Sequence, residues 1–223
     1  MKRKIEMFLL IFAMLLTSIS PFGVNVQAAE EIIEASGTFG EASTWKLEYG
    51  TLTISGSGNV DWYSIENPAP WYDYREQILT LVIEDGVNSI GDYSFYNCNY
   101  LEEVYLPDSL SSIGEYAFSE CSRLKKIELP DSIWSLQQGA FSGCSSLEEI
   151  KLPNSIYGYS IGSNAFSGCT SLQEISIPDS VESISSWAFT GCTNLRKIEV
   201  GADEIWGLAF QYCYNLEEVV LKN

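Results

Sequence analysis

The 223-residue sequence contains no histidine. Without an imidazole, the chain cannot form a Ser-His-Asp triad, a Cys-His pair or a His-ligated zinc site. Basic residues are scarce as well, since 12 Lys and Arg stand against 30 Asp and Glu, for a formal net charge of −18. A surface of this sign repels phosphate backbones and anionic headgroups, so we expect no nucleic acid partner and no binding to a membrane surface.

The one long apolar run covers residues 7–19 and is interrupted only by Thr17 and Ser18. Three basic residues precede it, and small residues lead up to Ala28. This arrangement predicts a secretory signal peptide over residues 1–28, cleaved after Ala28, because the run is too short to span a bilayer comfortably. We therefore expect a secreted protein, free or associated with the cell surface, with no membrane insertion after cleavage.

Cysteine marks an internal repeat. The six cysteines are separated by 23, 23, 25, 23 and 21 residues. Between them the text repeats as L-x-x-[IV]-x-[LI]-P-[DN]-S-[LIV]-x-x-[IL]-x-x-x-A-F-x-x-C. Full copies occupy 101–123, 124–146, 147–171 and 172–194, a weaker copy precedes them at 78–100, and a shortened copy and a partial seventh follow. Self-similarity at this period predicts a solenoid of stacked coils.

The pattern within one copy predicts a short strand and a return segment. Val104 and Leu106 alternate with Tyr105, as in a strand with one buried face. Pro107 ends the strand because it cannot donate to a ladder, and Phe118 brings the chain back to the core. Stacked copies predict a mainly β, leucine-rich-type repeat solenoid over residues 78–223, with short parallel strands on one face and irregular or helical segments on the convex side.

Each cysteine occupies the equivalent position of its copy, so all six are expected to point the same way. We interpret them as small, buried, unpaired thiols, because a uniform register explains every position without pairing. The alternative is a disulfide framework, which export and an even number of cysteines allow. A zinc cluster is not expected, since no C-x-x-C spacing occurs.

The recurring string L-P-D-S-[LIV]-x-S-I-G-x-x-A-F-x-x-C-x-x-L resembles the BspA-type leucine-rich repeat of bacterial surface proteins. The resemblance covers residues 78–223, and the segments 50–60 and 70–91 look like the entry module that leads such arrays. It implies a curved solenoid, export, and an adhesive or protein-binding role. It does not imply an enzyme or a cofactor.

The sequence pattern of residues 29–77 differs from that of the repeat and predicts a β-rich N-terminal cap. Apolar and polar residues alternate on both sides of Gly50, which predicts a β-hairpin that turns there. A loop rich in aromatic residues follows and includes Trp62 and Trp71. These rings are either a platform for sugar or peptide, or a cover for the open end of the first coil, and we favour the cover.

Outward positions of the predicted strands form columns along the array. The third position of each copy alternates in charge almost throughout: Glu103, Lys126, Glu149, Glu174, Lys197, Glu218. We interpret this column as cross-strand ion pairs that fix the register of the coils, rather than as a binding stripe. Only Glu149 and Glu174 place like charges together, and they flank the two-residue insertion of the copy at 147–171.

Candidate binding residues come from exposed aromatic positions. Trp134 and Tyr157 share a column just after the turn, Tyr159 belongs to the insertion, and Tyr105 occupies the variable fifth position. Exposed aromatic residues are frequent interface anchors, and insertions in repeats often map to the binding side. The alternative is that these rings pack over neighbouring coils.

These observations favour an extracellular recognition or adhesion module that binds a protein or a cell-surface ligand. A passive spacer is one alternative, and a carbohydrate-binding module that uses Trp62 and Trp71 is another. Paired carboxylates such as Glu102 and Glu103 do not suggest catalysis, because adjacent strand residues point to opposite faces. No calcium-loop pattern occurs either, so no metal site is expected.

Overall fold

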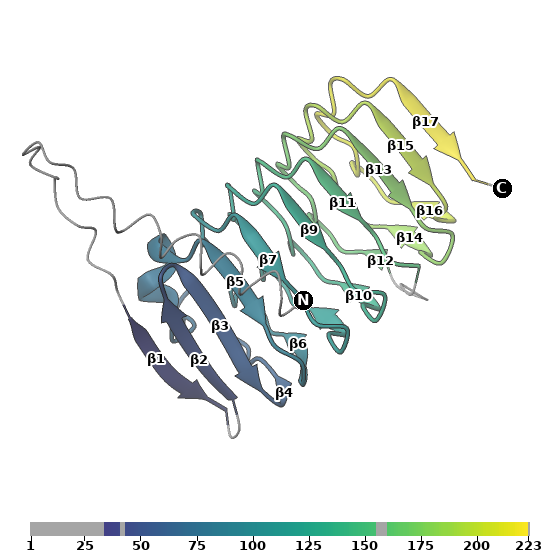
Figure 1. Ribbon diagram of the computed structural model, residues 1–223. Coiled ribbons are helices and arrows are strands. Elements are labelled where there is room, and N and C mark those ends of the chain that lie inside the picture. The colour runs from purple at the N-terminus through teal and green to yellow at the C-terminus, as the bar shows by residue number, and fades with distance from the viewer. Residues whose placement is uncertain (1–33, 41–42, 155–159, 223) are drawn as a thin grey trace, which may run out of the picture. The chain divides into compact units, whose positions relative to one another are not determined.

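The computed structural model describes residues 34–40, 43–154 and 160–222 (Figure 1). These residues form a mostly β solenoid, as the repeat predicts. The predicted signal peptide, Tyr157 and Tyr159 lie outside the described residues. Within the described part of the chain, no helix has the length and apolarity to cross a membrane.

The longer strands follow one another along one face of the coils, and we call their outward side the strand face (Figure 1). They are β3 (Thr51–Gly56), β5 (Thr80–Ile83), β7 (Glu103–Tyr105), β9 (Lys126–Glu128), β11 (Glu149–Lys151), β13 (Glu174–Ile177), β15 (Lys197–Val200) and β17 (Glu218–Leu221). Where these strands pair, they pair in parallel and in the predicted register. Glu149 lies opposite Lys126, and Lys197 lies between Glu174 and Glu218. These residues of the predicted charge column are therefore neighbours in space.

A second ladder of very short parallel strands lies after the turns, and the sequence did not predict it. It consists of β4 (Gly58–Asn59), β6 (Val87–Ile90), β8 (Ser112–Ile113), β10 (Ser135–Leu136), β12 (Ser160–Ile161), β14 (Ser183–Ile184) and β16 (Glu204–Ile205). All of these strands except β6 have two residues, which are too few for an alternation of polar and apolar positions to be recognised. From β8 to β14, each of these strands places one buried Ile or Leu in the core.

The return segments are tight turns. The 3₁₀-helix η1 (Tyr72–Gln77) is the one helical element of the described chain. Each coil turns through two left-handed positions, which are Tyr116 (φ 52°) and Glu120 (φ 63°) in one coil and Gly139 and Gly143 in the next. At Gly139 a side chain is also excluded by space, because a Cβ atom there would lie 2.3 Å from the Tyr116 ring. The ring of one coil therefore lies over the glycine of the next.

A column of aromatic rings runs through the core. Neighbouring rings stack with centroids 5.2–5.7 Å apart in the order Trp71, Phe95, Phe118, Phe141, Phe166, Phe189 and Phe210. Trp71 takes the place of a phenylalanine at the start of this column, is fully buried, and donates its indole N–H to the Ser94 carbonyl at 2.8 Å. This position corresponds to the cover interpretation of the N-terminal aromatic residues.

The cysteines form a second column, and all six are unpaired. Five thiols donate to the phenylalanine carbonyl of the preceding coil at 3.1–3.3 Å, as Cys144 does to Phe118. Burial raises the pKa of the Cys98 thiol to about 12, and it raises the pKa of the others as well. The prediction of unpaired, buried thiols is confirmed for five positions, while Cys213 is half-buried.

The N-terminal segment is a hairpin that joins the solenoid without a break in its sheet. β2 (Ser43–Glu48) pairs antiparallel with β3 through Tyr49 and Gly50, which both have positive φ, so the hairpin predicted near Gly50 is confirmed. β1 (Ala35–Phe39) adds antiparallel to β2. β3 then pairs in parallel with β5. The segment before residue 77 therefore supplies the first coil as well as the cap.

Candidate functional site

The strand face contains a hollow next to the coil that carries the insertion. Hydrogen bonding along the longer strands is interrupted twice in the described chain, between β7 and β9 and between β11 and β13. The second interruption lies between Glu149 and Glu174, the two like charges that the sequence places side by side. We define the strand-face hollow as the depression of about 290 Å³ at this interruption.

The hollow has an apolar floor and a polar wall. Ile150, Leu152, Ile175 and Pro178 supply the apolar part. The polar part consists of Lys151, Asn154, Glu174, Ser176, Lys197, Glu199 and Lys222. A second depression of about 440 Å³ shares Asn154, Pro178 and Lys222 with it. The two depressions are therefore neighbouring parts of one surface at the C-terminal ends of the longer strands.

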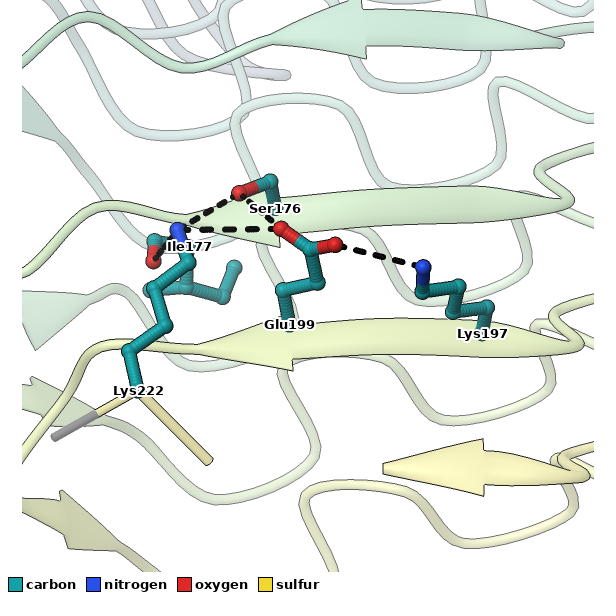
Figure 2. A network of polar contacts seen from close by, with 5 residues as sticks. All are labelled: Ser176, Ile177, Lys197, Glu199 and Lys222. Atoms are coloured by element: carbon teal, nitrogen blue, oxygen red, sulfur yellow. Dashed lines mark hydrogen bonds and ion pairs between the residues drawn. The ribbon is translucent and has the colours of Figure 1, made fainter. Parts of the chain in front are cut away.

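Glu199 is the centre of a polar network (Figure 2). Ser176, Lys197, Glu199 and Lys222 of this network also line the hollow. The Glu199 carboxylate lies 3.2 Å from the Lys197 ammonium and 3.9 Å from that of Lys222, and it accepts a hydrogen bond from the Ser176 hydroxyl at 3.2 Å. The hydrogen bond from Lys197, followed by that from Ser176, lowers the pKa of Glu199 below its usual value. The same contact with Glu199 raises the pKa of Lys197. The site therefore keeps these ions charged near neutral pH.

Lys222 connects three coils. Its side chain starts just beyond β17, passes β15, and donates to the Ser176 hydroxyl at 2.8 Å and to the Ile177 carbonyl at 3.3 Å on β13 (Figure 2). A long side chain that is held at its far end loses rotational freedom, so it forms a fixed wall. The ammonium group is consequently placed at the hollow.

The hollow is a cationic spot on an acidic protein. Three lysines and two glutamates line it, whereas the whole chain has a formal net charge of −18. Glu199 compensates Lys197 and Lys222 in part. The side chain of Lys151 is exposed, and it makes no ion pair or hydrogen bond with any residue that the structure describes. Among these residues it therefore differs from Lys197 and Lys222, which both pair with Glu199.

The structure places the predicted aromatic site residues on separate elements. Trp62 follows β4 and is 81% exposed. Tyr105 ends β7 on the strand face and donates its hydroxyl to Glu103 at 2.8 Å. Trp134 precedes β10 of the second ladder and is 40% exposed, while Trp71 is buried in the cap. No cluster of metal-ligating side chains occurs within the described ranges.

The sequence contained one signal of the hollow that we interpreted only as an irregularity. The like charges of Glu149 and Glu174 in neighbouring copies, together with the insertion, mark the coil boundary where the hollow lies. Lys222 lies after the last full copy, 46 residues from Ser176, so repeat spacing alone did not connect them. Side-chain reach across two coils is a property of the folded array.

Stacked coils of about 23 residues, with parallel strands on one face and a phenylalanine column inside, define a leucine-rich-type repeat protein. The chain belongs to the BspA type leucine rich repeat family, whose model matches six copies over residues 71–159 and 157–223. This finding confirms the resemblance that the repeat predicts. No curated protein sequence matches the chain significantly.

Solved structures agree with the fold. The crystal structure of the T. pallidum leucine-rich repeat protein is 26% identical, covers 85% of this chain and 90% of that protein, and gives a TM-score of 0.62. The pneumococcal vaccine antigen PcpA is 20% identical over 70% of this chain, with a TM-score of 0.53. This chain spans 36% of the PcpA structure, and that likeness concerns the fold alone.

Proposed function

We propose that this chain is a secreted or surface-associated recognition module that binds a protein or a cell-surface ligand through its strand face. The observation that carries the proposal is the strand-face hollow, which combines an apolar floor, charged walls and Lys151, a lysine without an ion-pair partner among the described residues. Binding sites commonly combine an apolar surface with a few placed polar groups. Membership of a family of repeat scaffolds and the signal peptide predicted over residues 1–28 support the location outside the cell.

The aromatic positions are proposed as secondary anchors. Tyr105 lies on the strand face itself, and Trp134 lies in the coil before the insertion. The same role remains a prediction for Tyr157 and Tyr159. Replacing Trp134, Tyr157 and Tyr159 with serine is expected to weaken partner binding and to leave the thermal midpoint nearly unchanged. Loss of folding would instead assign these rings to packing.

The direct test is a binding screen with residues 29–223 against extracellular matrix proteins, host cells and a glycan array. The binding measurement for each hit is then repeated with the Ser176→Tyr variant, in which a tyrosine fills the hollow. Tyr105 is a tyrosine at the equivalent, fifth position of another copy, so the fold accepts this residue there. Val82→Tyr makes the same kind of change at the fifth position of the copy at 78–100, within β5 and outside the hollow, and is the matched control. We expect Ser176→Tyr to abolish binding and Val82→Tyr to preserve it.

Equal binding by both variants would move the site away from the hollow. A screen without any protein, cell or glycan partner would contradict the recognition role and favour a passive spacer.

Glycan binding is the second candidate, and it depends on Trp62. This ring is 81% exposed, in contrast to Trp71 in the same segment. Exposed indole rings are suited to stacking against apolar sugar faces. Glycan-array signals that disappear in Trp62→Ser, without any protein partner, would establish this alternative.

A further inference from the structure

We infer that the strand-face hollow binds a single carboxylate of a partner protein, presented by a segment that is otherwise neutral or basic. This inference rests on the proposed recognition role and specifies the chemistry of its ligand. It follows from three features of the described residues: an unpaired ammonium, the size of the hollow, and the acidic residues that surround it.

The ammonium group of Lys151 supplies the main attraction. Lys151 lines the hollow from β11 and has no ion-pair partner among the described residues, whereas Lys197 and Lys222 share Glu199. The Lys222 ammonium lies on the opposite side, beyond the interruption between β11 and β13. A carboxylate placed between Lys151 and Lys222 accepts charge-assisted hydrogen bonds, which are stronger than neutral ones.

The size of the hollow limits what enters it. A volume of about 290 Å³ lies at the lower end of the range for small-molecule sites. It fits one side chain with its aliphatic part against Ile150 and Ile175, which form part of the apolar floor. The rest of the partner then lies across the neighbouring strands.

The surrounding charges determine the rest of the ligand. Glu128 is the register partner of Lys151, Glu218 that of Lys197, and Asp179 lines the adjoining depression. These carboxylates repel further negative charge close to the hollow, and the negative charge of the whole chain acts in the same direction. A glutamate or aspartate flanked by lysine or arginine therefore complements this surface, and an all-acidic segment does not.

The test uses residues 29–223 and two capped peptides, Gly-Lys-Gly-Glu-Gly-Lys-Gly and the same sequence with Gln in place of Glu. Binding is followed by NMR amide shifts, which also locate the site. We expect the Glu peptide to bind about tenfold more tightly than the Gln peptide and to shift the amides of Lys151 and Ser176. Lys151→Met is expected to remove this preference, because it deletes the unpaired ammonium.

Lys125→Met is the matched control. Lys125 is exposed, lies outside the hollow, and likewise makes no ion pair with a described residue. It should keep the preference for the Glu peptide. Equal affinity of the two peptides, absence of binding by both, or equal losses in Lys151→Met and Lys125→Met would each overturn the inference.

Two further outcomes separate this inference from the recognition role. In the first, glucuronate shifts the amides of Lys151 and Ser176 and the Glu peptide does not. This result would overturn the inference that the carboxylate belongs to a protein. In the second, a partner from the screen no longer binds the Ser176→Tyr variant but still binds the Lys151→Met variant. This result would preserve the recognition role and overturn the inference that the hollow binds a carboxylate.

Discussion

The inside and the outside of this solenoid differ at the coil boundary where the inserted copy meets the next one. Between the coils of Cys144 and Cys169, the phenylalanine rings still stack at 5.7 Å and 7°, and the thiol still donates to the carbonyl of Phe141 at 3.2 Å. At the same boundary, the longer strands β11 and β13 lose their ladder and a hollow opens. Core packing therefore continues across a coil boundary at which the ladder of the longer strands does not.

The largest expected effect comes from breaking the inner column. Phe166→Ala removes a fully buried ring that stacks on Phe141 and Phe189. We expect a loss of about 3–5 kcal/mol of unfolding free energy, as for other large core truncations. Urea denaturation followed by circular dichroism measures it. A loss below about 1 kcal/mol would show that the column contributes little to stability.

Deleting Gly158 and Tyr159 tests the outer face alone. The deletion restores the 23-residue period of the copy at 147–171. We expect β11 and β13 to form backbone hydrogen bonds, the hollow to close, and partner binding to be lost. Slower amide hydrogen exchange in these two strands is the readout. Exchange in β7 and β9, which are interrupted without an insertion, should stay unchanged and serves as the internal control.

The buried thiols predict that the stability of the core depends on pH. Burial raises the pKa of Cys98 to about 12 from an unfolded value of 9.0, so the folded state favours the protonated thiol. Stability from this group is complete below pH 9 and declines as pH rises from 9 toward 12, because only the unfolded chain releases the proton readily there. Denaturation midpoints between pH 8 and 11 measure the decline.

The matched control for this pH effect is the Cys98→Ala variant, whose midpoint should decline less over the same interval. Thiol reagents provide an independent check. They should find six thiols in the unfolded chain and react first with half-buried Cys213 in the native protein. A count below six would indicate a disulfide.

The smallest effect is expected for Glu199→Gln. The network around Glu199 is exposed to solvent, where ion pairs contribute little to stability. We expect an unchanged thermal midpoint and a changed ligand affinity, because Lys197 and Lys222 lose their shared partner. A large fall in the midpoint would contradict the separation of core and strand face.

Repeat spacing predicted the features that recur in every coil. The cysteine register and the strand positions around Val104 follow from it, and the structure contains them. The hairpin at Gly50 lies outside the repeat, and the alternation of apolar and polar residues around that glycine predicted it. The second ladder was missed, because each of its strands is too short to show a periodicity. The reach of Lys222 to Ser176 was missed for another reason, since contact over two coils depends on side-chain length and not on the repeat.

The cysteine column has a consequence for how such arrays change in length. Five of the six thiols hydrogen-bond a carbonyl one coil back, and no sulfur is paired with another sulfur. An odd number of coils is then as well satisfied as an even number, so a duplication or loss of one repeat leaves no unmatched thiol. Single-coil steps are therefore open to the evolution of this array and to its redesign.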